Sequence, residues 1–257
     1  CDLDNSDGDA YINITIDFPL YDTAVSEESG GAVRLINFGL TAENVTFTNC
    51  ASTKGGGGAI YIFNNIQNED VPSYSIILTG LLFKECKANY GAAVYIYSPS
   101  EKSPIQITSC IFDSNELISS GGKIYGGSAL YLTCHNSDIV SCLFMRNKGR
   151  GGAIKINDNF DILPEGLKLL QRVTNYTQGS IFISGCSFEI DENSDSLLYY
   201  DNEMRSTKIE VNDCSFSGKL GKDAHYIDGQ TYDKERPGLL IKSCKFSSDE
   251  RGAINSN

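Results

Sequence analysis

The stretch STKGGGGAIYI, residues 52–62, joins four consecutive glycines to a segment in which small and apolar residues alternate. A glycine run by itself is typical of a flexible linker. Here the glycines lead directly into a strand-like pattern, and that combination recurs along the chain, which indicates an internal repeat. The related copies are GGAVRL (30–35), GAAVYI (91–96), GSALYL (127–132), GGAIKI (151–156) and a final GAI (252–254).

A second unit lies between these copies, with the template apolar-x-apolar-x-x-[Cys/Val/Leu]-x-Phe. Its clearest examples are IQITSCIF (105–112), IFISGCSF (181–188), IEVNDCSF (209–216) and LLIKSCKF (239–246). Successive Phe positions are 28 to 44 residues apart, so the variable length belongs in loops. The template gives seven phenylalanines one equivalent position: Phe47, Phe83, Phe112, Phe144, Phe188, Phe216 and Phe246.

The spacing inside each unit predicts which side chains share a face. Alternate residues of a strand point to the same side, so Ile60 and Ile62 are expected inside the fold. Tyr61 lies between them and is expected to face solvent, because Arg34 and Lys155 occupy the same slot in other copies.

Corners are expected at two places in each repeat. One is the pair of small or polar residues before Cys-x-Phe, and the other is the glycine stretch. In 52–62 the corner is assigned to Gly57 and Gly58, where the backbone needs freedom that a Cβ would deny. Gly55 and Gly56 are interpreted as a simple lengthening of the turn.

Short strands bent at repeated corners predict an all-β fold, a parallel β-helix of about seven to eight coils with loop insertions. A β-sandwich also has short strands, but it has no reason to repeat one template. The chain is expected to form a single domain over 1–257. Residues 1–29 are assigned to a first coil or cap, and 157–180 to a loop insertion with a possible short helix at 163–173.

Composition limits the classes of partner. The net charge of −12 argues against nucleic acid, which requires a basic surface. No apolar run is long enough for a membrane helix, so no transmembrane segment is expected in this chain. Nine cysteines and three N-glycosylation sequons, at Asn13, Asn44 and Asn175, favour an extracellular or cell-surface location.

The pairing of GGA[ILV] with Phe-x-x-Asn resembles the polymorphic outer membrane protein repeat, found in bacterial autotransporter-type adhesins and surface proteins of some protists. It occurs here as GGAV (30–33), GGAI (57–60 and 151–154), FDSN (112–115) and FMRN (144–147). The resemblance extends from about residue 30 onward and implies a right-handed β-helix with a surface role. The Asn slot departs from the family pattern at Cys50, Cys86, Asp191, Lys219 and Asp249.

Five cysteines share the slot two residues before Phe. They are interpreted as a largely unbonded row of core side chains, although stacked coils would bring them within disulfide range. Cys50 and Cys86 follow Phe at matching corners and are the best disulfide candidates. The five of the core row are Cys110, Cys142, Cys186, Cys214 and Cys244.

Tyr61, Tyr95 and Tyr131 occupy one slot in three consecutive copies and are candidates for stacking on glycans or on a protein partner. Tyrosine is also a good strand former, so a structural role stays open. The acidic segment 2–10 fails the EF-hand spacing, and no metal site is predicted, although a looser calcium site stays open. His135 and His225 are expected to be ordinary surface or corner residues.

Glycosidases present two carboxylates on one face, and the outward slots here carry no such cluster. The sequence therefore predicts a non-enzymatic protein without a cofactor. The first hypothesis is an extracellular adhesin, coat or fibre component that associates end to end, because both ends look like unfinished coils. A longer parent chain explains the same ends. The alternatives are a polysaccharide lyase or hydrolase and a carbohydrate-binding module. Expected partners are further copies, glycans or host and cell-surface ligands.

Overall fold

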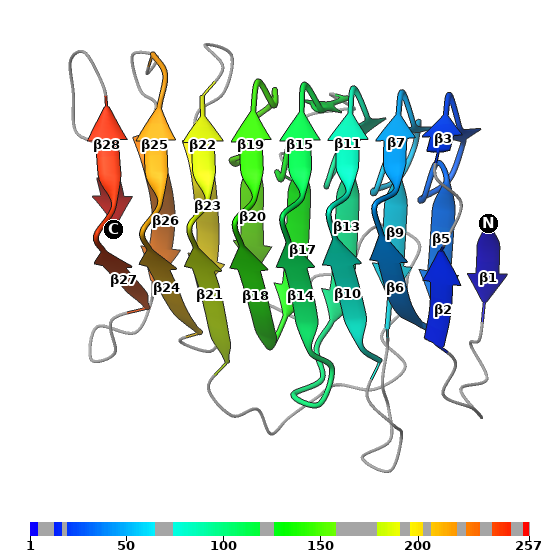
Figure 1. The fold of residues 1–257 in the computed structure, drawn as a ribbon, viewed down its shortest axis with the longest axis horizontal. Helices are drawn as coiled ribbons and strands as arrows, with labels where there is room; N and C mark the ends of the chain where they lie inside the picture. The colour runs from blue at the N-terminus through cyan, green and yellow to red at the C-terminus, as the bar shows by residue number, and fades with distance from the viewer. Residues whose placement is uncertain are drawn as a thin grey trace.

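The computed structural model describes residues 1–4, 13–16, 20–64, 74–118, 126–157, 179–190, 196–202, 207–219, 225–231, 238–247 and 254–256. Every regular element in these residues is a β-strand, and the strands pair in parallel. In Figure 1 they stand side by side in sequence order, with the N-terminus at one end of the stack and the last coil at the other.

Two eight-stranded sheets, B and C, form consecutive faces of the coil. Sheet B consists of β2 (Asn13–Ile16), β6 (Gly39–Glu43), β10 (Ile76–Thr79), β14 (Ile105–Thr108), β18 (Asn136–Val140), β21 (Ser180–Ser184), β24 (Lys208–Asn212) and β27 (Leu239–Lys242). Sheet C consists of β3 (Leu20–Asp22), β7 (Thr46–Thr48), β11 (Leu82–Lys84), β15 (Ile111–Asp113), β19 (Leu143–Met145), β22 (Ser187–Glu189), β25 (Ser215–Ser217) and β28 (Lys245–Ser247).

Sheets A and D complete the coil. Sheet A consists of β1 (Asp2–Asp4), β5 (Val33–Ile36), β9 (Ile60–Phe63), β13 (Val94–Ser98), β17 (Leu130–Cys134), β20 (Ile154–Asn157), β23 (Ser196–Asn202), β26 (His225–Thr231) and β29 (Ile254–Ser256). Sheet D consists of β4 (Val25–Ser26), β8 (Ala51–Ser52), β12 (Lys87–Ala88) and β16 (Glu116–Leu117).

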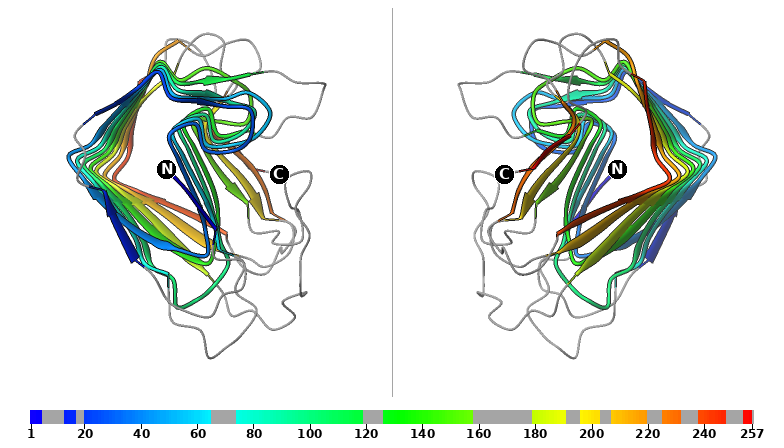
Figure 2. Two further views of the ribbon diagram at one scale, coloured as in Figure 1. Left: turned by 90° about the vertical axis from the view of Figure 1, so that its right-hand side faces the viewer. Right: turned by 90° about the vertical axis from the view of Figure 1, so that its left-hand side faces the viewer.

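The chain runs from sheet B to sheet C, through sheet D in the first four coils, and then along sheet A. In Figure 1 the strands of B and C rise at the front while those of A descend behind, and the coils advance from N to C as a right-handed screw. Figure 2 looks along this axis and shows the coils superposed. The predicted parallel β-helix is confirmed, with eight coils.

Two segments singled out in the sequence, 1–29 and 157–180, are described only in part. Within residues 1–29, strands β1 to β4 stack on the second coil in the common sheets. The helix expected at 163–173 lies outside the described residues, as does most of the loop 157–180.

Aromatic rings fill the interior behind sheet C. The six phenylalanines from Phe47 to Phe216 are buried, whereas Phe246 in the last coil is only half-buried. Neighbouring ring centroids are 4.7 to 5.1 Å apart, and the rings are nearly parallel. Tyr21 adds an eighth ring in the first coil, 5.0 Å from Phe47. Each fully buried ring contributes about 1.5–3 kcal/mol through its removal from water.

The corner between sheets B and C has one backbone conformation in seven coils. The residue before the Cys slot adopts a left-handed conformation, with φ between 50° and 65°. Gly takes up this conformation without strain and Asn and Asp with little, whereas bulky or β-branched side chains are strongly disfavoured in it, which is consistent with a slot that is never apolar. The residues are Asn44, Gly80, Ser109, Ser141, Gly185, Asp213 and Ser243.

The glycine run has a more specific role than the sequence suggested. Gly57 has a φ of 63°, and a Cβ there would collide with the carbonyl oxygen of Ile60. A Cβ on Gly56 would collide with the ring of Tyr90 in the next coil. The interpretation of Gly56 as a mere lengthening of the turn is therefore wrong, because close approach of that ring requires glycine.

Candidate functional site

The predicted tyrosine row lies on the outside of sheet A but does not face solvent. The Ile side chains that alternate with Tyr61 belong to the interior, so the predicted direction of the side chains is right. The predicted exposure is wrong: Tyr61, Tyr95 and Tyr131 are at most 7% exposed. They form a second apolar cluster together with Ile36, Phe63, Tyr90 and Tyr97. We call this group the outer aromatic cluster.

Rings in the outer aromatic cluster stack from coil to coil. The centroids of Tyr61 and Tyr95 are 5.0 Å apart, and those of Phe63 and Tyr97 are 4.7 Å apart. Tyr90 packs its edge on Tyr95 from outside the sheet, at 5.1 Å. The repeat gave no signal for Tyr90, because it belongs to the corner before the GAAVYI strand rather than to the strand.

Arg34 and Lys155 occupy the same slot as Tyr61, and their charges suggested that this slot faces solvent. In the structure both side chains have partners. Lys155 is buried, and its Nζ lies over the rings of Tyr131 and Tyr199, 5.6 and 5.0 Å from their centroids. Arg34 donates to the carboxylate of Asp2 at 2.9 Å. A basic residue in this slot therefore does not indicate exposure, because a long side chain can lay its apolar stem and its charge along aromatic faces.

Because the tyrosines of the outer aromatic cluster are buried, the free energy of unfolding is expected to decrease at alkaline pH. Desolvation raises the pKa of Tyr61 and Tyr95 well above the usual value. The unfolded chain loses these two protons above about pH 10 while the folded chain keeps them, so stability falls as pH rises further. We expect a loss of about 1.4 kcal/mol per pH unit for each tyrosine, measured by urea unfolding across this range.

The variant Tyr95→Phe is the matched control for the pH dependence. It keeps the ring stack and removes one ionisable hydroxyl, so the slope of stability against pH above the tyrosine pKa should become shallower. An unchanged slope in this variant would contradict the assignment.

The corner after sheet C carries a short ladder of buried amides. The Asn115 Nδ2 donates to Asn147 Oδ1 at 2.9 Å and to the Phe83 carbonyl at 3.2 Å. The Asn147 Nδ2 donates to the Phe112 carbonyl at 2.9 Å. Cys86 takes the equivalent slot one coil earlier, and its N–H donates to Asn115 Oδ1 at 3.0 Å. The amide ladder therefore spans the two coils that carry FxxN, and in the preceding coil Cys86 occupies the Asn slot.

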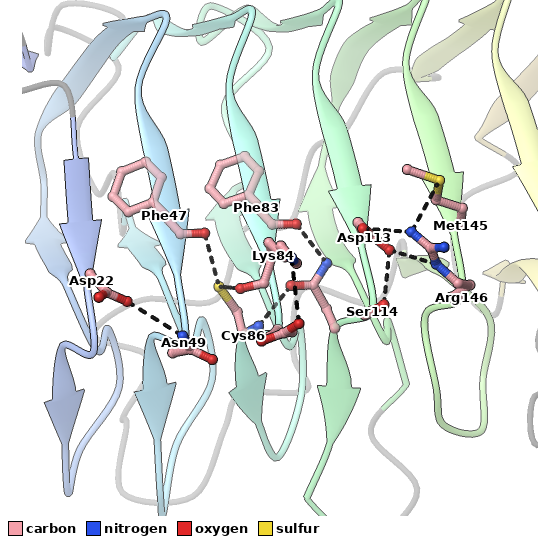
Figure 3. Close-up of polar contacts among 12 residues, drawn as sticks. Asp22, Phe47, Asn49, Phe83, Lys84, Cys86, Asp113, Ser114, Met145 and Arg146 are labelled. Carbon is pink, nitrogen blue, oxygen red and sulfur yellow. Dashed lines mark hydrogen bonds and ion pairs between the residues drawn. The ribbon is translucent and has the colours of Figure 1, made fainter.

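Beside this ladder, an ion pair joins two coils. The Asp113 carboxylate accepts from Arg146 Nε at 2.9 Å and from Nη2 at 2.7 Å, and the Ser114 hydroxyl also donates to it (Figure 3). The Asp113 side chain is nearly buried, while that of Arg146 is half-exposed. Arg146 holds a φ of 54°, which is unfavourable for a long side chain.

Two substitutions at Arg146 separate the ion pair from the backbone conformation. Arg146→Ala leaves a nearly buried carboxylate without its cation and should lower the free energy of unfolding. Arg146→Gly loses the same ion pair but relieves the left-handed backbone, so it should be about 1 kcal/mol more stable than the Ala variant. Urea unfolding of the two variants measures this difference, and a less stable Gly variant would contradict it.

All nine cysteines lie within the described residues, and all are free thiols. Cys50 and Cys86 do occupy matching places in neighbouring coils, but the disulfide predicted between them is not present. Instead the Cys86 Sγ contacts the Phe47 carbonyl at 3.8 Å and the Lys84 carbonyl at 3.6 Å.

The predicted core row of thiols is confirmed. Cys110, Cys142, Cys186 and Cys214 are buried, and Cys244 in the last coil is half-buried. Each sulfur lies 3.2 to 3.7 Å from the carbonyl two residues earlier and from a carbonyl of the preceding coil. A separate thiol, Cys134, is also buried, and desolvation raises its pKa to about 12. The buried thiols therefore act as packing groups.

The remaining predicted positions are dispersed. Asn44 is exposed at a corner, whereas the side chain of Asn13 and all of Asn175 lie outside what the structure describes. In the acidic N-terminal segment, Asp2 pairs with Arg34. His135 lies at the corner between β17 and β18, one of the two expected settings, but it is buried there, and its Nε2 is 3.8 Å from a Glu101 oxygen.

Within the described residues, no group of three or more His, Cys, Asp or Glu side chains is arranged to hold a metal ion. No helix in this part of the chain has the length and apolar character needed to cross a membrane. Comparison with family models, curated proteins and solved structures gives no match to the chain.

Proposed function

We propose that the chain is a non-enzymatic protein of the extracellular space or cell surface, with an adhesive or structural role. The main observation in support of this proposal is the continuous stack of eight coils. Its aromatic rings, amides and thiols contact their counterparts or the backbone of neighbouring coils. Such a solenoid is a stiff rod with extended outer faces, suited to spacing or presenting contacts. The GGA[ILV] and FxxN repeat supports membership of the polymorphic outer membrane protein repeat family.

The location can be tested on native material. Antibodies against the purified chain, with immunogold electron microscopy and protease shaving of intact cells, should place the protein on the surface or in a secreted coat or fibre. Exclusive retention inside the cell would contradict the proposal.

The non-enzymatic role is tested separately. The purified chain should bind cells or immobilised glycans without releasing products. Accumulation of reducing ends or unsaturated sugars from a panel of acidic and neutral polysaccharides would favour a hydrolase or lyase instead. The buried tyrosines are not available as a sugar-stacking surface, so binding is expected to survive Tyr95→Phe.

Asn44 offers a modification that would mark an extracellular route. Its side chain lies at the exposed corner between β6 and β7, beside Gly80 of the next coil, and Thr46 completes the sequon. We expect the native protein to lose the mass of a glycan on treatment with an N-glycosidase. The Asn44→Gln variant should lack the glycan at this position and should therefore lose correspondingly less mass. An unmodified Asn44 in native protein would remove glycosylation at this position from the proposal.

A further inference from the structure

Sheet C carries an apolar band on its outer face in the middle coils. Each three-residue strand of this sheet points its central residue inward and its first and third residues outward. The first outward position holds Leu82, Ile111 and Leu143 in three neighbouring coils, in register with one another. Ile111 is 36% exposed and is the one strongly exposed large hydrophobic residue of the middle coils in the described part of the chain. We call these three residues, together with Met145, the outer apolar band.

The fold itself does not require apolar residues in this slot. In the next two coils the same outward position holds Ser187 and Ser215, and in the preceding coil it holds Thr46, while the strands keep the same register. The inward phenylalanines supply the core in every one of these coils. An exposed apolar band that the coil does not need for its own packing indicates a contact surface.

Charged residues flank the outer apolar band in a pattern that complements itself. The second outward position holds Lys84 in one coil and Glu189 three coils later. A half-turn about an axis that lies midway between β15 and β19, parallel to the strands, exchanges these two positions. The same half-turn exchanges Ile111 with Leu143. Under this operation an apolar residue therefore meets an apolar residue, and a cation meets an anion.

We propose that the outer face of sheet C binds the same face of a second copy of this chain across that two-fold axis. The coil axes of the two copies then run in opposite directions, and the contact is isologous, so assembly closes at a dimer. The inference goes beyond the function proposed above and does not depend on it. The facing pairs, each present twice, are Ile111 with Leu143, Leu82 with Ser187, Lys84 with Glu189, Thr46 with Ser215 and Thr48 with Ser217.

The charges that meet in this register are accessible to each other. Lys84 Nζ lies 3.7 Å from a Glu85 oxygen, and both side chains are nearly half-exposed, so this ion pair within the chain is weak. Glu189 is exposed, and its neighbours in the same outward column are Met145 and Ser217. The dimer therefore gains two pairs of Lys84 with Glu189, and its facing positions set no like charges against each other.

The other two-fold arrangement of the same faces is unfavourable. An axis along the screw axis would exchange the two outward columns and place Ile111 on Asp113 and Leu82 on Lys84. Apolar side chains would then cover charged groups, which costs free energy because the charges lose water without gaining hydrogen bonds. The antiparallel arrangement of the coil axes is therefore the one that the residues favour.

Sheet C presents only two outward residues per coil, so the contact is narrow and weak. Sedimentation velocity of the full chain therefore covers concentrations from about 1 μM to about 1 mM. We expect a reversible equilibrium that stops at the dimer. Lys84→Glu or Glu189→Lys should raise the dissociation constant about tenfold or more, and the two changes together should restore it. Lys148→Glu, a charge reversal at an exposed lysine of a middle coil outside sheet C, should leave it unchanged.

A thiol placed in the outer apolar band supplies a readout specific to this face. Cys1 is the one exposed cysteine, so the test uses the Cys1→Ser background. The alkylation rate of the Ile111→Cys variant should fall as the dimer forms, in proportion to the remaining monomer. The Gln106→Cys variant, changed at an exposed outward position of sheet B, should keep its rate. A dimer that leaves the Ile111→Cys thiol fully reactive would form through another surface and would overturn the proposal.

The outcomes separate this inference from the proposed function. A chain that stays monomeric up to about 1 mM overturns the dimer and leaves the surface role standing. Assemblies that grow beyond the dimer, or a dimer indifferent to both charge reversals, overturn the proposal as well. A chain that dimerises through sheet C but resides only inside the cell overturns the extracellular role and leaves the dimer standing.

Discussion

Gly57→Ala is expected to lower the free energy of unfolding by about 3 kcal/mol or more, combining a left-handed backbone with overpacking. The residue holds a φ of 63° at the corner before sheet A, and an added Cβ would collide with the carbonyl of Ile60. Neither the carbonyl nor its strand can move easily, since the backbone on both sides is bonded to neighbouring coils. Urea unfolding followed by circular dichroism measures the loss.

Gly80→Ala is the matched control for that substitution. Gly80 also has a positive φ, of 65°, but its added Cβ would meet only the exposed side chain of Asn44, at 2.6 Å. We expect a loss of about 1 kcal/mol, the cost of the backbone conformation alone. Equal losses in the two variants would show that the collision at Gly57 contributes nothing.

Phe112→Ala should destabilise the chain by about 3–5 kcal/mol, because it opens a ring-sized cavity in the middle of the aromatic stack. The Phe112 ring is buried between Phe83 at 4.9 Å and Phe144 at 4.7 Å, so both faces lose a neighbour. Hydrogen exchange should show the loss of protection concentrated in the coils on either side, as expected when repeats contact only their neighbours.

Phe246→Ala is the control at the end of the stack. The ring is half-buried and has one stacked neighbour, Phe216, at 4.9 Å. Measured at concentrations where the chain is monomeric, this variant should lose clearly less stability than Phe112→Ala. A loss as large as that of Phe112→Ala would contradict the view that stacking on both faces sets the cost.

The sequence was most informative where one slot recurs in every coil. The Phe positions and the Cys row could be predicted because a stacked coil gives each equivalent residue the same surroundings. Tyr21 could have been found in the same way, because ITIDFPLY (14–21) follows the template with Pro19 in the Cys slot and Tyr in place of Phe. Tyr21 was missed because the template allowed only Phe at its last position.

Burial outside the coil could not be predicted from the repeat. Alternation along β9 tells which side of the strand Tyr61 occupies, but not what packs against that side. The burial of Tyr61 depends partly on Tyr90, whose position is set by a corner of variable sequence. The charge of Lys155 suggested exposure, although this side chain packs over an aromatic ring. The disulfide prediction failed for a related reason: Cys50 and Cys86 were placed in neighbouring coils correctly, yet adjacency does not by itself form a bond.

The backbone hydrogen bonds between strands run along the screw axis. We therefore expect the mechanical strength of the rod to depend on the direction of the applied force. Sheets A, B and C hold successive coils together by hydrogen bonds that point from one coil to the next. A force pulling on the two ends loads these ladders one after another, so coils would peel away singly, each releasing about 30 residues or on the order of 100 Å of chain. A force applied along the strands loads many bonds at once. The same molecule would therefore resist shear across its faces far better than tension along its length.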